Sequence, residues 1–507
     1  MAATALSRDE PTALAGPPPP GPRGTAPWLV AGLVTVVLVL LAGRYGYHRD
    51  ELYFLLCGRH LDWGYVDQGP LVPALARVMD TVAPGNLVAL RTPSALVAGG
   101  AVLLVTAIAR QFGAGRGGQL LAAVLAGTSG IVLAGGHLLS TTTIDLLVWL
   151  AAGYAAIRVL RGEHRWALLI GLALGVGMLN KLLPALLAVG LLAGVAIAGP
   201  RRLLRDRWVL AGALVAVLLA APNLAWQAAH GFPQLGVASS IADGDSSYSG
   251  RLDAAVLQLL IISPYAAPIW VAGLIALLRR PAWRAYRALG WAWPVVFGIV
   301  LAAGGKGYYD APLLLVLTAA GAVVTTAWAR TATRRILLAV GAAVTVASSA
   351  VLLLPTLPAD RLPGFVVDVN YDSGETIGWP AFADSLAAVH RALPAEQRRR
   401  AVVLTGNYGE AGAVARYGPP RGLPRAYSGH NSMADFGRPP ADADVVIAVG
   451  WERPDQLRAW FDEVDLAGRV DQRVGVDNDE NGGPIWLCRG LRRPWEQIWE
   501  PEVRHAG

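Results

Sequence analysis

Two adjacent stretches decide the fold of this chain: Trp28–Ala42, WLVAGLVTVVLVLLA, and Tyr45–Phe54, YGYHRDELYF. The first is apolar and belongs to a run, 27–43, that is long enough to cross a hydrocarbon layer of about 30 Å as a helix. The second places charged and aromatic side chains, with Asp50 beside Glu51, where the chain leaves the bilayer. Charge at that depth is costly and tends to mark function, so this junction predicts a membrane protein with a functional site at the membrane surface.

The composition extends this prediction to most of the chain. Of the 507 residues, 54% are hydrophobic and only 16% are charged, which is too apolar for a soluble protein of this length. The stretches expected to span the membrane as helices are 27–43, 87–109, 118–136, 141–160, 166–180, 182–199, 208–226, 254–278, 288–303, 311–329 and 335–354. We therefore expect an α-helical polytopic membrane domain over 27–357, with about 11 transmembrane helices, and one soluble domain over 358–507.

Arginine placement orients the predicted spans. Basic clusters fall in alternate loops, near 110–116, 158–165, 201–207, 279–287 and 330–335. Because basic loops stay in the cytoplasm, we expect the first long loop, 44–86, and the C-terminal domain on the outer side of the plasma membrane. The leader, 1–26, is polar and rich in proline, which predicts a disordered cytoplasmic segment and no cleavable signal peptide. The net charge of +7 then reflects topology rather than a nucleic-acid surface.

Lysine is almost absent, which makes the two lysines that remain informative. Of 43 basic residues, only Lys181 and Lys306 are lysine, and both fall at expected external ends of helices. Lys306 lies in the segment GGKGYYDAP, where small residues let the backbone approach a ligand and a compact ammonium suits phosphate. The paired Tyr308 and Tyr309 strengthen this interpretation of Lys306. The alternative for each lysine is a side chain that snorkels to the interface, and for Lys181 both interpretations are equally open.

The first external loop carries carboxylates that a lipid-facing helix would not keep. Asp50 either acts chemically or caps the helical run that follows it, 52–60. Asp67 lies in the segment WGYVDQGP, which separates that run from a second one, 71–79. Both runs have apolar residues at helical spacing, so we expect two amphipathic helices on the membrane surface.

A second polar loop lies between the third and fourth predicted spans. It begins near His137 and ends at Asp145, just inside the fourth span, with Ser and Thr residues between them. An aspartate inside a membrane helix indicates a functional site by default. The alternative is a buried carboxylate that is hydrogen-bonded to Thr141 or Thr142.

These segments resemble a known family. Arg49–Phe54, followed by Trp63–Leu71, look like the first external loop of bacterial glycosyltransferase family 39-type proteins. These proteins have the GT-C fold and are relatives of the protein O-mannosyltransferases and of the lipid A aminoarabinose transferase. The segments His137–Asp145 and Lys306–Pro312 also resemble family positions, and the likeness covers most of 27–330.

The resemblance implies a membrane glycosyltransferase with an inverting reaction on the extracytoplasmic side. The donor would be a sugar linked to polyprenyl phosphate, and the acceptor a hydroxyl of a cell-envelope protein, lipid or polysaccharide. Asp50 would be the general base, with Glu51 as its supporting neighbour. Lys306 and Tyr309, and less directly Tyr308, would contact the phosphate as it leaves.

The resemblance also implies roles for other residues of the same loops. His48 and Arg49 would help to bind the phosphate. The supporting residues of the site would be Asp67, His137, Asp145 and Lys181. No cofactor is implied, and the chain has no His/Cys cluster with the spacing of metal ligands, although a divalent metal is left open.

The C-terminal domain has an α/β pattern of its own. Strand-like runs are 401–404, 445–449 and 484–487, and helix-like runs are 377–393, 410–417 and 454–464. The segment 477–482 opens like a calcium loop, but Cys488 stands where the final Glu should be, which favours an acidic turn. Cys57 and Cys488 are both expected outside, so a disulfide between them stays open, although nothing in the sequence brings the two sites together.

Two other classes of protein fit part of the pattern. A transporter or lipid flippase would also have many helices and charge in the membrane, but its ionisable residues would lie near the bilayer midplane. Its halves would also repeat, and we see no internal repeat. A receptor or scaffold built around the C-terminal domain would leave Asp50, Lys306 and Tyr309 without a task. We therefore expect the enzyme, with the transporter as the alternative.

Overall fold

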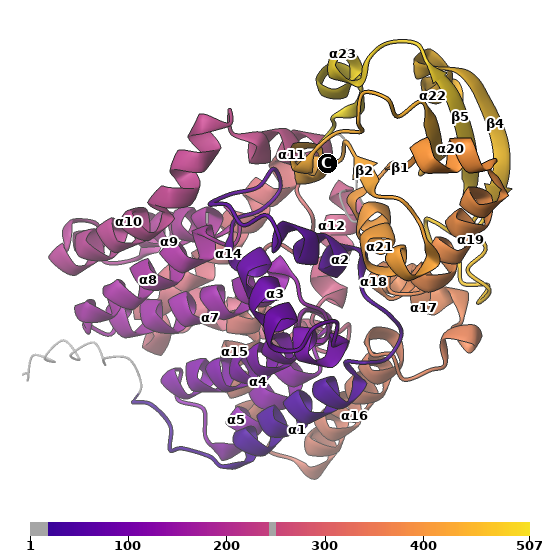
Figure 1. Cartoon of the computed structure of the whole chain (residues 1–507). Coiled ribbons are helices and arrows are strands. Elements are labelled where there is room, and N and C mark those ends of the chain that lie inside the picture. The colour runs from indigo at the N-terminus through magenta and orange to yellow at the C-terminus, as the bar shows by residue number, and fades with distance from the viewer. Residues whose placement is uncertain (1–18, 243–249, 507) are drawn as a thin grey trace, which may run out of the picture.

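The structure, a computed structural model, describes residues 19–242 and 250–506. A helical part comes first in the chain, and a smaller part that contains a β-sheet follows it, at the upper right of Figure 1. Most of the predicted leader lies outside the described residues. The last helix of the helical part is α16 (Ala332–Leu353), and the domain boundary between residues 357 and 358 stays a prediction.

Helices occupy every stretch that the sequence predicts to span the membrane. Nine of the predicted spans are single α-helices: α1 (Ala26–Leu41), α4 (Leu87–Gln111), α7 (Thr141–Leu160), α8 (Ala167–Met178), α9 (Pro184–Ala198), α10 (Arg207–Ala229), α14 (Arg287–Ala302), α15 (Ala311–Trp328) and α16. The first external loop forms α2 (Arg49–Cys57) and α3 (Leu71–Val82), as expected, and α11 (Pro233–Ala242) follows α10. Short 3-10 turns precede α8, α10 and α14: η1 (His164–Trp166), η2 (Arg201–Arg205) and η3 (Pro281–Tyr286).

Two predicted spans are broken rather than continuous. The third is split into α5 (Arg116–Gly127) and α6 (Gly130–His137), which are bent by 53°. The eighth is split into α12 (Arg251–Leu260) and α13 (Ala267–Arg279). Pro264 explains this second break, because proline lacks the helical N–H and disfavours helix in the preceding residue. The two breaks lie against each other, since the Ile131 amide donates to the Ile261 carbonyl at 3.2 Å.

Six helices of the described part are long and apolar enough to cross a membrane. They are Leu87–Gln111, Thr141–Leu160, Arg207–Ala229, Pro281–Ala302, Ala311–Trp328 and Ala332–Leu353. The bent pair α5–α6 would make a seventh, and α1, α8, α9 and α13 are apolar but shorter. The chain is therefore a helical multi-span membrane protein, and the expected total of about 11 spans stays a prediction.

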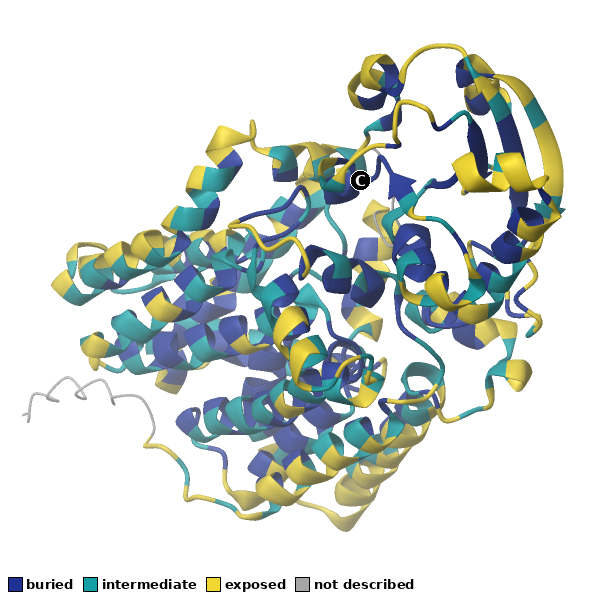
Figure 2. Cartoon of the chain, in the orientation of Figure 1, coloured by how far each residue is buried: buried dark blue, intermediate teal, exposed yellow. Residues whose placement is uncertain are grey.

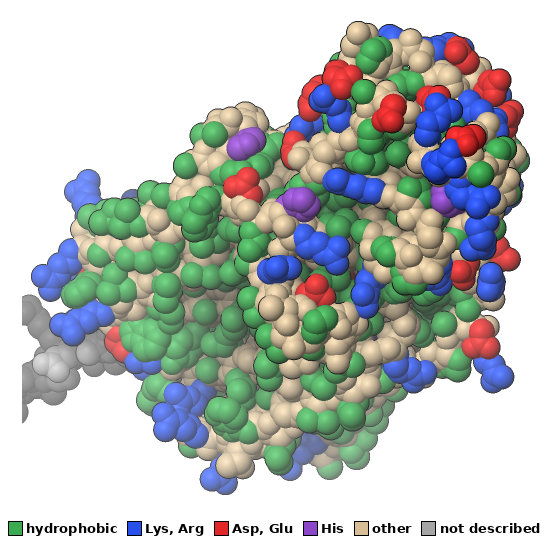
Figure 3. All heavy atoms as spheres, viewed as in Figure 1, with side chains coloured by type: hydrophobic (Ala, Val, Ile, Leu, Met, Phe, Trp, Pro, Cys, Tyr) green, Lys and Arg blue, Asp and Glu red, His purple; other side chains and the backbone are tan. Residues whose placement is uncertain are grey.

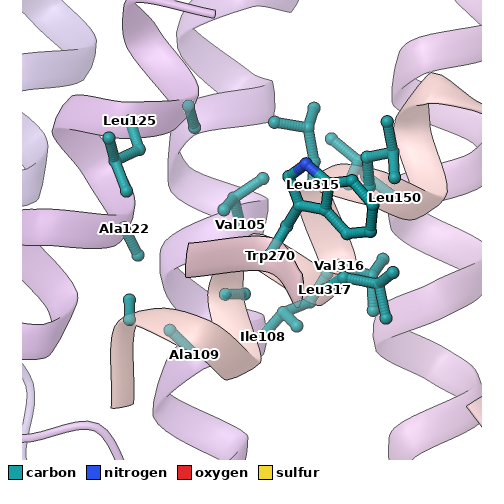
Figure 4. Close-up of a cluster of buried hydrophobic side chains, with 14 of the residues drawn as sticks. Val105, Ile108, Ala109, Ala122, Leu125, Leu150, Trp270, Leu315, Val316 and Leu317 are labelled. Atoms are coloured by element: carbon teal, nitrogen blue, oxygen red, sulfur yellow. The ribbon is translucent and has the colours of Figure 1, made fainter. Parts of the chain in front are cut away.

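Helices α4, α7 and α15 form the centre of the bundle. Buried residues make up 67% of the most apolar stretch of α7 and of α15, but only 11% of that of α16. Figure 4 shows part of this core, with Val105 of α4, Trp270 of α13 and Leu315 of α15 in one cluster. A Cβ on Gly273 would lie 2.0 Å from the Leu317 carbonyl oxygen, so α13 and α15 pack backbone to backbone. Such small residues allow close van der Waals packing, which holds helices together in a bilayer.

The outer helices turn apolar side chains outward. On α16, Ile336, Leu337 and Val340 are all more than half exposed, and exposed residues mark its outer face in Figure 2. In Figure 3, hydrophobic side chains cover most of the helical part, whereas charged side chains gather on the C-terminal part and at the far edges of the bundle. A large exposed apolar surface indicates an interaction site, and here it fits contact with lipid tails.

The C-terminal part is built on a five-stranded mixed sheet with the order β2-β1-β3-β5-β4. The strands are β1 (Ala401–Thr405), β2 (Ala426–Ser428), β3 (Val445–Val449), β4 (Phe461–Arg469) and β5 (Pro484–Leu491). Strand β1 is parallel to β2 and β3, whereas β5 is antiparallel to β3 and β4. Every residue of β1 and β3 is buried, as expected for central strands that are covered on both faces.

The predicted strands and most of the predicted helices of this domain are present. The helices are α17 (Gly364–Val369), α18 (Tyr371–Gly374), α19 (Trp379–Ala392), α20 (Ala395–Arg400), α21 (Tyr408–Tyr417), α22 (Asp455–Trp460) and α23 (Trp495–Ile498). Shorter helical turns are η4 (Ala359–Arg361), η5 (Pro419–Arg421), η6 (Asn431–Phe436) and η7 (Trp499–Val503). The helix predicted over 454–464 is wrong in its second half, because pairing with β5 makes Phe461 onward an edge strand.

The two parts of the molecule share one core. Leu52 and Phe54 of α2 belong to the same buried cluster as Trp379 and Phe382 of α19. Figure 1 shows α2 beside α21, and a Cβ on Gly412 of α21 would lie 2.6 Å from Cβ of Leu52. The C-terminal part is therefore packed directly onto the first external loop.

Both cysteines are free and buried. Cys57 lies in the shared core, whereas Cys488 lies in the cluster on the other face of the sheet. The disulfide that the sequence left open is therefore not formed.

Candidate active site

A cavity of about 480 Å³ lies where the helical part meets the C-terminal part. Its charged and polar lining residues include His48, Arg49, Asp50, Asp67, Gln68, Lys181, Lys306, Tyr308, Asn370, Tyr371, Asp372, Tyr408, His430, Asn431 and Asp479. Its apolar lining residues come from the broken helices and their neighbours and include Ile131, Ala134, Leu138, Val237, Ile241, Leu257, Ile261 and Leu353. The lining therefore combines charged and polar groups with hydrocarbon side chains.

Asp50 faces this cavity and does not cap its helix. The cap of α2 is His48, whose Nδ1 accepts from the Asp50 amide at 3.1 Å, while Glu51 accepts from the His48 amide at 2.9 Å. The Asp50 side chain is 36% exposed, and its Oδ1 accepts a hydrogen bond of 2.8 Å from the Tyr408 hydroxyl. The capping alternative for Asp50 is therefore wrong, and its carboxylate keeps lone pairs for chemistry.

Glu51, the other member of the pair, is turned into the protein. Its oxygens accept from Arg91 Nε and Nη2, both at 2.8 Å, and from the Leu139 amide at 3.0 Å. Neither Glu51 nor Arg91 is exposed, and Arg91 also donates to the carbonyls of Ala42 and Gly46. Glu51 thus fastens α2 to α4 rather than facing a substrate. Arg91 is an arginine inside the predicted span 87–109, which indicates a buried partner or a site, but the sequence analysis did not single it out.

Both lysines of the chain line the same cavity. Nζ of Lys181 lies 5.7 Å from the centre of the Tyr309 ring, and the rings of Tyr308 and Tyr309 pack edge to face. Burial and the neighbouring Lys181 lower the pKa of Lys306. For Lys181, burial disfavours the ammonium, but Tyr309 and the carboxylates around it raise its pKa. Two cations that repel each other in one cavity favour an anionic ligand between them.

The supporting carboxylates differ in their access to the cavity. Asp67 lines it, accepts from the Tyr53 hydroxyl at 2.9 Å, and has its pKa raised to about 6 by burial. Asp145 is buried behind the cavity and accepts from Asn180 Nδ2 at 3.0 Å, not from the two threonines that the alternative named. His137 lines a small neighbouring recess together with Asp372.

The basic residues before Asp50 are occupied by the C-terminal part. Nε2 of His48 lies 3.6 Å from Asp372 Oδ1, and Nη1 of Arg49 lies 3.4 Å from Glu375 Oε2 and 3.3 Å from Asp479 Oδ2. Burial opposes the charge of His48, but Asp372 and Asp50 outweigh it and raise its pKa to about 8. Because His48 and Arg49 already have carboxylate partners, the two lysines are the better candidates for an anion.

The acidic turn over 477–482 takes part in this contact. Asp479 also accepts from the Tyr371 hydroxyl, and Asn478 Nδ2 donates to the carbonyls of Gly374 and Ile377. Within 19–242 and 250–506, no group of three or more His, Cys, Asp and Glu side chains is arranged to hold a metal ion. The turn joins parts of the protein through its side chains, as an acidic turn would.

Part of the chain is similar to a known protein family. Residues 67–226 match the family described as dolichyl-phosphate-mannose-protein mannosyltransferase. This part of the chain, which runs from the first external loop into α10, is therefore similar to a family of membrane glycosyltransferases. The matched segment ends before Lys306 and begins after Asp50, so the family match does not assign their roles.

Solved structures show that the fold of this chain is shared with other proteins. ArnT from Cupriavidus metallidurans bound to undecaprenyl phosphate has a TM-score of 0.58 at 15% identity, covering 92% of this chain and 98% of that one. The same protein in the apo state has a TM-score of 0.59 at 15% identity, covering 90% and 97%. No curated protein matches the sequence significantly.

The structure brings most of the predicted site residues together. Those that line the cavity are His48, Arg49, Asp50, Asp67, Lys181, Lys306 and Tyr308, whereas Glu51, His137, Asp145 and Tyr309 do not. The residues that the sequence did not reveal come from the C-terminal part, above all Tyr408 and Asp372. They carry no local motif, and only the packing of α18 and α21 against the first loop brings them to the site.

Proposed function

We propose that this enzyme transfers a sugar from a polyprenyl-phosphate carrier to an acceptor hydroxyl at the extracytoplasmic surface, with inversion. The observation that carries the proposal is the lining of a single cavity. Asp50 and the only two lysines of the chain, Lys181 and Lys306, line it together with a wall of hydrocarbon side chains. A carboxylate base, a cationic site for phosphate and an apolar site for a lipid tail are the parts that such a transfer needs.

The apolar wall fits the carrier. It is formed where α6 and α12 end or bend, with Ile131, Ile261 and Leu353 among its residues. The breaks in the two spans open this wall beside the lysines, so a lipid-linked phosphate can lie with its tail on the hydrocarbon and its charge near Lys306. The ammonium groups of Lys181 and Lys306 would stabilise the phosphate as its bond to the sugar breaks.

The exposed carboxylate of Asp50 fits the base. The acceptor hydroxyl would donate its proton to Asp50, and its oxygen would bond to the sugar carbon as the bond from that carbon to the phosphate oxygen breaks. Attack from the face opposite the phosphate inverts the configuration of that carbon. Asp50 accepts a hydrogen bond from Tyr408 of the C-terminal part, which supports an acceptor that approaches from that side.

The positions of the arginine clusters support a cavity that faces the outer side of the membrane. Helix α7 begins at Thr141 on the cavity and ends near Arg158, while α14 begins near Arg287 and ends just before Lys306. The cavity therefore lies at the helix ends that lack the basic clusters. By the positive-inside rule, those ends face away from the cytoplasm.

The family match favours the enzyme over the transporter. The ionisable residues of the cavity lie at helix ends and in the first loop, under the C-terminal part, rather than halfway along the spans. A transporter would place them near the bilayer midplane.

The decisive experiment follows radiolabelled sugar from polyprenyl-phosphate monosaccharides with the purified protein. We expect label to reach an envelope acceptor, or slowly water, with the wild type and to be lost by a factor of about 10³ with Asp50→Asn. Asp442→Asn, a change of an exposed aspartate in the C-terminal part, is the matched control and should keep full activity. Turnover retained by Asp50→Asn would remove Asp50 as the base, and no turnover with any donor would contradict the transfer itself.

Sidedness has a separate test. A cysteine at position 442, in a protein whose Cys57 and Cys488 are replaced, should react with a membrane-impermeant maleimide in intact cells, because residue 442 is exposed. Protection from the reagent until the cells are broken would place the C-terminal part inside.

A further inference from the structure

Tyr408 of the C-terminal part reaches the candidate base across the cavity. Its hydroxyl donates the 2.8 Å hydrogen bond to Oδ1 of Asp50, a residue 358 positions away in the sequence. A hydrogen bond to a carboxylate is charge-assisted, so it is shorter and stronger than one between neutral groups and restricts the orientation of both partners.

The Tyr408 ring is held on several sides. It stacks on Tyr53 of α2, with ring centres 4.6 Å apart and planes 26° apart. The Arg49 guanidinium carbon lies 5.2 Å from the ring centre, and the His430 ring centre lies 4.7 Å away. These contacts come from both parts of the molecule, so the hydroxyl is aimed at Asp50 only when the two parts are docked.

The start of α21 is built for this position. Asn407 accepts from the Glu410 amide and Glu410 accepts from the Asn407 amide, a reciprocal cap that makes Tyr408 the first residue of the helix. A Cβ on Gly409 would lie 2.7 Å from Cβ of Arg49, so the residue after Tyr408 has to be glycine for α21 to approach α2.

We propose that Tyr408 is a positioning residue for the transfer, an inference that rests on the proposed function of Asp50. Its hydroxyl donates to Oδ1 of Asp50, which fixes the orientation of the carboxylate and leaves its remaining lone pairs for the acceptor. The acceptor proton goes to Asp50, and Tyr408 keeps its own proton throughout. The C-terminal part is then a component of the catalytic centre, not only a cover.

The chemistry of Tyr408 agrees with this division of roles. Burial and the charge of Asp50 hold the pKa of Tyr408 well above its usual value. A phenol that stays protonated is a hydrogen-bond donor at every physiological pH and does not compete with Asp50 as a base.

The test removes only the hydroxyl. With Tyr408→Phe, we expect kcat to fall about tenfold and KM for the donor to change less than about twofold, because the donor lies on the lysine side of the cavity. The acidic limb of the pH profile of kcat/KM should move up by about one pH unit, since Asp50 loses a hydrogen bond to its charged form. Tyr417→Phe, the same change at the other end of α21, is the matched control and should alter neither.

A second measurement needs no turnover, so it separates this inference from the proposed function. The purified protein is treated with a water-soluble carbodiimide and glycine ethyl ester across a pH series, and labelling of the Asp50 peptide is followed by mass spectrometry. The pH midpoint of labelling should rise by about one unit in Tyr408→Phe and stay unchanged in Tyr417→Phe. An unchanged midpoint would overturn the inference even if the rate fell, because a rate loss alone would mark a structural role.

Discussion

The two sides of the cavity differ in how their cations are satisfied. On the side of the C-terminal part, His48 and Arg49 are paired with Asp372, Glu375 and Asp479. On the side of the membrane helices, Lys181 and Lys306 line the cavity, and neither forms an ion pair with any described residue. Both sides are basic in sequence, but only on the side of the C-terminal part do the cations form ion pairs with described residues.

This difference separates a binding side from a fastening side. A cation that is held in a cavity without a carboxylate partner is costly, and a bound anion removes that cost. A cation that already has a partner holds two elements together, and here those elements are the first loop and the C-terminal part. Asp50 lines the same cavity as the lysines and contacts Tyr408 of the C-terminal part, which is consistent with a base that a donor and an acceptor would both reach.

The largest expected effect comes from the ion pair between Glu51 and Arg91, which fixes α2, the helix that contains Arg49. Glu51→Gln would leave Arg91 buried with an uncompensated charge, so we expect a loss of about 3–5 kcal/mol of stability. Thermal unfolding in detergent measures it, with Asp50→Asn as the control that should unfold like the wild type. The double variant Glu51→Leu with Arg91→Met should recover most of the loss, because it removes both charges. An unchanged melting temperature for Glu51→Gln alone would contradict the fastening role.

The next effect tests the binding side. Lys306→Ala and Lys181→Ala should each lower kcat/KM for a lipid-linked donor about tenfold, since each removes one charge from the phosphate site. Stability should change little, because no ion pair is broken. Arg116→Ala, at the opposite end of the bundle, is the control for loss of a cation. Donor kinetics that match the wild type in both lysine variants would count against the phosphate site.

A smaller effect is the pH dependence of stability that the His48–Asp372 pair should cause. The pKa of His48 is raised from 6.5 to about 8, so its charged form stabilises the folded state fully below about pH 6.5 and is lost as pH rises through 8. We expect the wild type to lose about 1 kcal/mol of stability over that window, a value kept low because Asp372 is half exposed. Asp372→Asn should flatten this dependence in unfolding experiments at pH 6 and pH 9. An equal slope in both proteins would remove the His48–Asp372 pair as its source.

The smallest expected effect is none at all. Cys57 and Cys488 are free and lie in separate cores, so a reductant should leave the melting temperature unchanged. A shift of several degrees, or a mass two hydrogens lower before reduction, would mean that the two parts are also joined covalently.

Much of the fold follows from local sequence. Each predicted span is helical, because an apolar run of sufficient length has to satisfy its own backbone hydrogen bonds in a bilayer. The breaks at residues 128–129 and 261–266 and the edge strand after Trp460 were missed. A strand at the edge of a sheet depends on its partner, here β5, which lies farther along the chain.

Parts of the site could be predicted because charged residues are rare in the surrounding sequence. Lys181 and Lys306 stood out because the chain has no other lysine, and Asp50 because it follows a membrane span. Glu51 has the same local surroundings as Asp50, and the sequence could not show that one faces a cavity and the other Arg91. Adjacent residues of a helix point in different directions, and only the neighbouring helices decide which direction is buried.

By itself, therefore, the sequence determined the class of the protein, its helical spans and the rare charged residues at one end of them. The length of an apolar stretch and the charge of its residues are properties of short segments, so they can be predicted without knowing the fold. The tertiary structure alone decided that Tyr408 and Asp372 meet the first loop and that His48 and Arg49 fasten rather than bind. Those contacts join residues more than 300 positions apart, and they exist only because the shared core of α2, α19 and α21 holds the two parts together.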